Sequence, residues 1–171
     1  MTIIEKLTKD VLNDEYFKLI FSKCSLISAK YNLKIELSDN ILTNKELTDA
    51  LRFSDILSNS KSSEARNKAY QIITYLNHQF KNDEIYRTVS KAVYSKLGNF
   101  PAINYLTNYN ENIAVLPFFR SLEVEAKKII QKVPDSENDV FTDSQFELYS
   151  QLSNTLEYSF SGPTSMGKSF I

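Results

Sequence analysis

The chain has 171 residues, of which 42% are hydrophobic and 12% aromatic, and its formal net charge is −1. This hydrophobic content supports a folded core and excludes a disordered chain. A domain that binds nucleic acid mainly through its own surface is usually basic, so the near-neutral charge disfavours this function. The lone cysteine cannot form an internal disulfide. No signal peptide or long apolar span is present, so we expect a cytoplasmic protein without membrane contact.

Hydrophobic residues recur at helical spacing until about residue 155, which predicts a mainly α-helical fold. A first amphipathic segment carries Ile3, Ile4, Leu7 and Val11. A second, longer segment carries Phe17, Ile20, Phe21, Cys24 and Ile27. We interpret Cys24 as a small core residue, because no partner motif surrounds it. The alternating stretch 31–40 is interpreted as an irregular connector.

Three further helices are predicted in the middle of the chain. Thr43 and Glu46 form a capping-box pair at the start of the first, whose apolar positions are Leu47, Ala50, Leu51 and Leu57. After the polar run 58–63, the next helix has the clearest apolar stripe: Ala65, Ala69, Ile72, Ile73, Leu76 and Phe80. Asn82 is the predicted N-cap of the third helix, which ends at Leu97-Gly98.

Two prolines mark the beginnings of later helices. Pro101 opens a short helix with Ile103 and Leu106, and residues 94–102 weakly resemble the turn of a tetratricopeptide-type helical hairpin. Pro117 opens a helix that ends before Pro134. Its predicted inward residues are Phe118, Phe119, Leu122, Ala126, Ile129, Ile130 and Val133. Its late lysines, which suit the helix dipole, are Lys127, Lys128 and Lys132.

A boundary is predicted where periodicity stops. Residues 135–139 are acidic and polar, so we interpret residues 134–140 as a linker. Residues 1–133 are then a helical accessory or interaction domain of stacked helical hairpins. Residues 141–171 begin a second unit, with a capped amphipathic helix at 141–152 and a strand at 156–160.

The chain ends on a G-x-x-x-x-G-K-S phosphate-binding loop, whose residues are Gly162, Pro163, Thr164, Ser165, Met166, Gly167, Lys168 and Ser169. Glycine allows backbone N–H groups to point at phosphate oxygens without a Cβ in the way. We expect Lys168 to reach the β- and γ-phosphates and Ser169 to hold Mg²⁺. The sequence therefore predicts binding of ATP with Mg²⁺.

A glutamine-bearing helix, a strand and this loop together resemble the opening of the first RecA-like domain in DEAD/DEAH-box helicases of superfamily 2. Gln145 stands 23 residues before Lys168 (168 − 145 = 23), like the family's Q-motif glutamine. The resemblance implies that its amide, which both donates and accepts, pairs with adenine. The loop is similar to that of the DExH branches. Met166 and Ser169 depart from the commoner residues and leave the branch open.

The resemblance implies an ATP-dependent helicase or translocase that acts on nucleic acid. The family's acidic D-E-x-[DH] strand, arginine finger and second RecA domain lie outside these 171 residues, so we expect an N-terminal fragment that hydrolyses no ATP alone. By family analogy, the chain is compatible with bacterial phage-defence helicases that carry helical extensions. Two alternatives stay open: a helical module that binds a partner protein, and another P-loop NTPase.

Overall fold

A computed structural model describes residues 2–35, 41–103, 116–137 and 139–152. These residues confirm the mainly α-helical fold, and within them the chain forms no β-strand, only an isolated antiparallel bridge between Lys132 and Val140. The helices are α1 (Ile3–Asn13), α2 (Glu15–Asn32), α3 (Asn44–Ser58), α4 (Ser63–Phe80), α5 (Glu84–Leu97), α7 (Phe118–Ile130) and α8 (Asp143–Leu152). Residues 100–103 add a further helical turn. The predicted strand at 156–160 and the loop at 162–169 lie outside the described residues.

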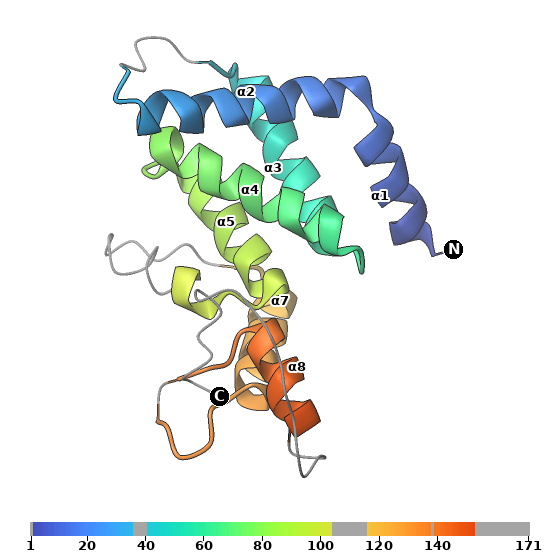
Figure 1. The fold of residues 1–171 in the computed structure, drawn as a ribbon, viewed down its shortest axis with the longest axis vertical. Coiled ribbons are helices and arrows are strands. Elements are labelled where there is room, and N and C mark those ends of the chain that lie inside the picture. The colour runs from blue at the N-terminus through green and yellow to red at the C-terminus, as the bar shows by residue number, and fades with distance from the viewer. Residues whose placement is uncertain (1, 36–40, 104–115, 138, 153–171) are drawn as a thin grey trace.

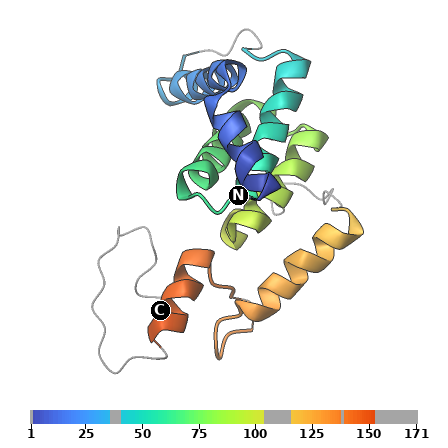
Figure 2. The ribbon, with the colours of Figure 1, turned by 90° about the vertical axis from the view of Figure 1, so that its right-hand side faces the viewer.

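Helices α1 to α5 form a bundle, and α7 and α8 form a smaller layer at one end of it (Figure 1). Helix α4 contacts α2, α3 and α5 and is the central helix of the bundle. Helix α7 contacts the bundle mainly through α5. Figure 2 shows α7 and α8 side by side below the bundle. The described chain thus has an apolar body and an appended helical pair.

The buried core follows the predicted apolar stripes of α2 and α4. The fully buried residues of these stripes are Ile20, Cys24, Ile27, Ala65, Ala69, Ile72, Ile73 and Leu76. Burial raises the pKa of the Cys24 thiol to about 12, so the thiol stays protonated, and its interpretation as a core residue is confirmed. The Tyr86 ring is also buried, and its hydroxyl donates to the Ile73 carbonyl at 2.9 Å. This bond satisfies the one polar atom that Tyr86 carries into the core.

Side-chain caps define where most helices begin. The capping boxes Thr2–Glu5 and Thr43–Glu46 are both complete, and the second confirms its prediction. The predicted N-cap at Asn82 is wrong by one residue. Asp83 is the N-cap of α5, because its carboxylate accepts a hydrogen bond from the backbone N–H of Tyr86 at 2.8 Å. A carboxylate at this position also suits the helix dipole.

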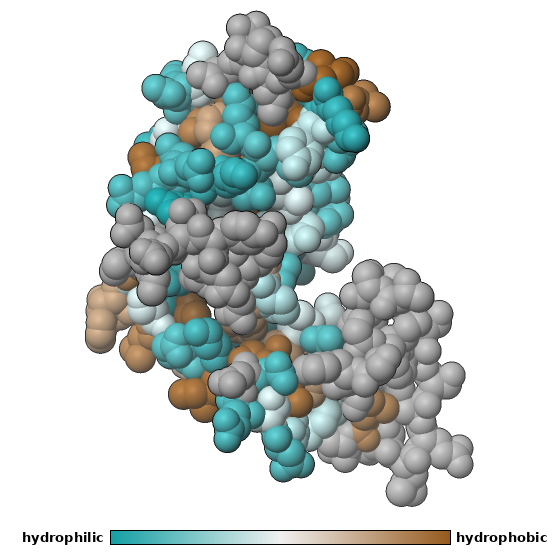
Figure 3. All heavy atoms as spheres, turned by 90° about the vertical axis from the view of Figure 1, so that its left-hand side faces the viewer, coloured by the Kyte–Doolittle hydropathy of each residue, from teal (hydrophilic) through white to brown (hydrophobic). Residues whose placement is uncertain are grey.

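The predicted orientation of α7 is wrong. Phe119 is 79% exposed and Ile129 is 75% exposed, and the other exposed residues of the predicted inward set are Phe118, Leu122, Ala126 and Ile130. The buried residue of α7 is Val124, which lies on the opposite side of the helix. The reason is electrostatic, since ion pairs hold the polar side of α7 against the bundle. Figures 2 and 3 show the molecule from opposite sides. Helix α7 lies at the lower right in Figure 2, and Figure 3 shows hydrophobic residues at the corresponding lower left edge.

Backbone hydrogen bonds join the two ends of the predicted linker. The N–H of Val133 donates to the Asp139 carbonyl at 3.1 Å, and the N–H of Phe141 donates to the Gln131 carbonyl at 2.8 Å. Phe141 is buried and stacks on Tyr149, with 5.1 Å between ring centroids. These bonds connect the end of α7 directly to the start of α8. The assignment of a domain boundary to this loop stays a prediction.

Acid is expected to weaken the contact between α2 and α3 through Glu46. The Lys23 ammonium is the main cause that holds the Glu46 pKa below its usual value of 4.5, and the Thr43 backbone N–H contributes. Because the folded-state pKa is the lower one, this stabilisation is present above about pH 4.5 and is lost as the pH falls through the folded-state pKa. Glu46→Gln keeps the capping-box acceptor but loses the charge. We expect the variant's urea midpoint to fall less than that of the wild type between about pH 6 and about pH 3.

A matched control for this measurement is Glu64→Gln, on the exposed first turn of α4. This control should keep the acid sensitivity of the wild type. Equal acid sensitivity of Glu46→Gln and the wild type would contradict the assignment to the Lys23–Glu46 pair.

Candidate functional site

Of the predicted site residues, the structure describes only Gln145. Residues 162–169, including the predicted phosphate ligand Lys168 and the predicted Mg²⁺ ligand Ser169, lie outside the described residues. The site that can be built from contacts is therefore the start of α8, where Gln145 occupies the first turn.

Gln145 has a structural role of its own. Its side-chain oxygen Oε1 accepts hydrogen bonds from the backbone N–H of Thr142 at 2.9 Å and from the Thr142 hydroxyl at 3.0 Å. In return, Thr142 Oγ1 accepts from the backbone N–H of Gln145 at 3.4 Å. This reciprocal pair is a capping box with glutamine in the place of glutamate. An adenine amino group would have to share Oε1 with this cap, and the adenine role of Gln145 stays a prediction.

Asp143, at the first position of α8, is the hub of a polar network. Its carboxylate accepts hydrogen bonds from Arg66 Nη2 and Gln131 Nε2, both at 2.8 Å, and forms an ion pair with Lys127 Nζ at 2.7 Å. Arg66 lies on α4, Lys127 on α7, and Gln131 just after α7. One carboxylate therefore joins α8 to the bundle and to α7 at the same point. Hydrogen bonds with charged partners are the stronger ones in proteins.

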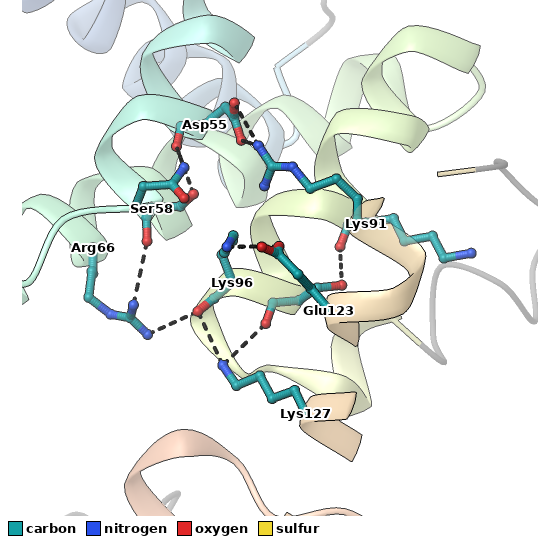
Figure 4. Close-up of polar contacts among 10 residues, drawn as sticks. Asp55, Ser58, Arg66, Lys91, Lys96, Glu123 and Lys127 are labelled. Carbon is teal, nitrogen blue, oxygen red and sulfur yellow. Dashed lines mark hydrogen bonds and ion pairs between the residues drawn. The ribbon is translucent and has the colours of Figure 1, made fainter. Parts of the chain in front are cut away.

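The two cations of this network also serve the end of α5. Arg66 Nη2 and Lys127 Nζ both donate to the Lys96 carbonyl at 3.3 Å, and Lys127 also reaches the Ser95 carbonyl (Figure 4). Carbonyls in the last turn of a helix lack intrahelical donors and carry partial negative charge. The cations therefore satisfy the helix end while they bind Asp143.

Gly98 makes room for the hub. It follows α5 with φ of 71°, the left-handed conformation that glycine adopts without strain. This confirms the predicted stop at Leu97-Gly98. A Cβ added at Gly98 would overlap Oδ1 of Asp143 and stand 2.9 Å from the Asp143 backbone nitrogen. Glycine is thus required both by the backbone conformation and by the approach of α8.

An open cleft of about 1500 Å³ lies beside the hub. It is bordered by the turn between α3 and α4, by the end of α5 and by the start of α8, and its lining includes Arg66, Lys128, Asp143, Gln145 and Glu147. Both charge signs occur in this lining, so the cleft favours neither an anion nor a cation by charge alone. Within the described part of the chain, no three His, Cys, Asp or Glu residues are grouped to hold a metal ion.

Ion pairs outside the hub hold α7 in place. Arg120 Nη2 contacts both carboxylate oxygens of Asp55 on α3, at 3.0 and 3.2 Å, and Lys96 Nζ pairs with Glu123 at 2.9 Å (Figure 4). The Lys96 ammonium is the main cause that lowers the pKa of the Glu123 carboxyl. All these contacts lie on one side of α7. They leave its apolar side facing outward.

No family model, no curated protein and no solved structure matches this chain significantly. Among the helices that the structure describes, none has the length and hydrophobicity needed to span a bilayer.

The hub was missed at the level of sequence. The sequence predicts a capped helix over residues 141–152, but the partners of Asp143 lie 12, 16 and 77 residues away in the sequence. Within its own segment, Asp143 looks like an ordinary first-turn acid of a helix. The glycine at position 98 was assigned to a helix end, and its second role needs the folded position of α8.

Proposed function

We propose that this chain is the N-terminal part of an ATP-dependent nucleic-acid helicase or translocase of superfamily 2. The observation that carries the proposal is the order of a glutamine-bearing helix and a G-x-x-x-x-G-K-S loop, with Gln145 23 residues before Lys168 (168 − 145 = 23). In this proposal Gln145 contacts adenine, Lys168 contacts the phosphates and Ser169 holds Mg²⁺. The near-neutral charge of the chain assigns most nucleic-acid contacts to other parts of such a protein.

The anchoring of α8 is compatible with this proposal. In a nucleotide-binding unit that begins at residue 141, the hub at Asp143 would fix the orientation of the Gln145 helix against α4 and α7. The helical body would then move together with the first helix of the nucleotide-binding unit. Binding groups placed on rigid elements hold their geometry better than groups on loops.

Gln145→Glu separates the adenine role from the capping role. Glutamate keeps the capping box, but an ionised carboxylate cannot donate a hydrogen bond to an adenine ring nitrogen. In the full protein proposed to contain this sequence, Gln145→Glu should lower the preference for ATP over GTP, expressed as the ratio of the two dissociation constants, by at least about tenfold. This factor corresponds to about 1.4 kcal/mol of binding free energy. Lys168→Ala should weaken both nucleotides, because it removes a phosphate contact. Calorimetric titration with each nucleotide measures both effects.

Thr142→Ala is the matched control, because it removes the hydroxyl of the cap and leaves the Gln145 amide. It should keep the preference for ATP. An unchanged nucleotide preference in Gln145→Glu, beside a loss of binding in Lys168→Ala, would favour another P-loop NTPase. Unchanged binding in Lys168→Ala would overturn the nucleotide site altogether.

The second candidate function is a helical module that binds another protein through residues 1–133. One observation favours it, namely the row of exposed apolar residues on α7. Contiguous apolar surface of this kind marks interaction sites in folded proteins. The two functions are compatible, because an accessory domain and a motor domain can occur in one protein.

A further inference from the structure

The exposed side of α7 is a continuous apolar face. We define the α7 apolar face as Phe118, Phe119, Leu122, Ala126, Ile129 and Ile130, all of which are exposed. At 3.6 residues per turn, these six side chains fall within an arc of about 120°. Phe118 and Phe119 contact each other edge to face, with ring centroids 5.5 Å apart. The face extends over the whole length of a 13-residue helix.

Rotation of α7 to bury this face against the described part of the chain would break existing contacts. The opposite side of the helix carries Arg120, Val124 and Lys127, which contact the bundle and the hub. Turning the α7 apolar face inward would break the pair of Arg120 with Asp55 and expose Val124. The pair of Lys127 with Asp143 would be lost as well, and both losses would leave a partly buried partner behind.

The positions of the six residues are symmetric about the middle of the helix. The spacings along the chain are 1, 3, 4, 3 and 1, so the pattern reads the same in both directions around Val124. Consider an antiparallel copy of α7, related by a two-fold axis that passes through the α7 apolar face at the height of Val124 along the helix. This arrangement places every apolar position at the same height as another apolar position. Closed two-fold interfaces require this kind of self-complementarity.

Residue sizes also match in this arrangement. The aromatic end of one helix, with Phe118 and Phe119, meets the isoleucine end of the other. In the middle, Leu122 meets the small Ala126, which allows the two helices to approach each other closely. A parallel arrangement would instead place the phenylalanines of both helices at one end and the isoleucines at the other.

The α7 apolar face supplies part of the area that a dimer needs. A buried aromatic side chain removes about 150–250 Å² from water. Two phenylalanines and three aliphatic residues, each 57–79% exposed, together offer several hundred square ångströms. A standard interface buries about 800 Å² per partner. Contacts around the helix would supply the remainder.

We propose that the α7 apolar face is a homodimer interface, in which α7 pairs antiparallel with α7 of a second copy of the chain. Phe119 packs against Ile129 of the partner subunit, and Leu122 packs against Ala126 of the partner subunit. The dimer presents two bundles on opposite sides of a central helix pair. This inference rests on the face alone and is independent of nucleotide binding.

Sedimentation velocity over a range of concentrations tests the dimer. We expect the 171-residue chain to shift from its mass of 19.7 kDa to twice this value, with a Kd on the order of 1–100 µM for an interface of this size. Leu122→Glu should weaken the dimer at least about tenfold, because it places a charge in the centre of an apolar contact. Leu19→Glu, on the exposed side of α2, is the matched control and should dimerise like the wild type. Both positions are exposed, and circular dichroism checks that both variants keep their helices.

Cysteine cross-linking tests the antiparallel direction. A mixture of Phe119→Cys and Ile129→Cys chains should form a mixed disulfide, whereas Phe119→Cys alone should not, since its two thiols lie about 15 Å apart along the helix pair. The native Cys24 is buried and does not compete. A monomer at all concentrations, a dimer insensitive to Leu122→Glu, or a cross-link between two Phe119→Cys chains would each overturn the proposal. The first two outcomes would assign the face to another occupant or to none, and the third would make the helix pair parallel.

Discussion

Asp143→Ala is expected to release α8 from the rest of the protein. The substitution removes the acceptor shared by Arg66, Lys127 and Gln131. Hydrogen bonds to a charged group contribute about 1.5–3 kcal/mol. About a third of the Asp143 side chain is exposed, and solvent screening reduces this contribution. We therefore expect a local loss of about 1–3 kcal/mol, seen as an about fivefold to 150-fold faster hydrogen exchange of α8 amides.

The bundle should respond much less to this substitution, because its core is built from apolar side chains of α2 and α4, and Arg66 is the α4 residue that bonds Asp143. Stability differs between parts of a structure, and hydrogen exchange resolves such parts separately. Asp143→Asn keeps an acceptor oxygen without the charge and should give an intermediate effect. Glu147→Ala, an exposed site on the same helix, is the control and should leave α8 protected. Unchanged protection of α8 in Asp143→Ala would mean that the hub does not hold the helix.

Gly98→Ala is expected to be more costly still. An alanine with φ near 71° is strained by about 1–2 kcal/mol. Its Cβ would also displace the Asp143 carboxylate from the hub. Together we expect a loss of about 2–4 kcal/mol, measured as the combined change in α8 protection and in the urea midpoint.

Two further variants separate the strain from the overlap. Gly98→Asn tolerates the left-handed conformation better than alanine but still carries a Cβ, so it should retain most of the loss. In the Asp143→Ala background, Gly98→Ala should cost at least about 1 kcal/mol less than in the wild type, as a double-mutant cycle measures. Relief will be partial, because the backbone nitrogen of residue 143 stays close. Strict additivity of the two substitutions would show that the overlap has no energetic effect.

The bundle was predictable from sequence because its signals are local. The stripe of α4, the cap at Thr43 and the stop at Gly98 each depend on residues within a few positions of one another. The predicted N-cap of α5 is one residue too early, because asparagine and aspartate are both good N-caps and only the fold shows which one bonds the helix.

The orientation of α7 could not be predicted in the same way. Its apolar stripe is also regular, and periodicity alone assigns such a stripe to a core. The deciding groups, Asp55, Lys96 and Asp143, come from three other parts of the chain and bind the polar side instead. At the candidate site, the spacing of Gln145 to Lys168 predicts a role for Gln145 that stays a prediction, whereas the hub beside it depends on contacts between distant residues.

The two layers of the protein are held together by different forces, and this difference has a consequence for solution behaviour. The bundle coheres through apolar side chains, whose attraction salt strengthens or leaves unchanged. The junction of α7 and α8 buries Leu116 and Val124 in the same apolar cluster but adds partly exposed ion pairs around Asp55, Lys96 and Asp143, which mobile ions screen. Ionic strength should therefore affect the two parts of the protein differently. We expect higher salt to weaken the attachment of the outer helical pair more than the bundle.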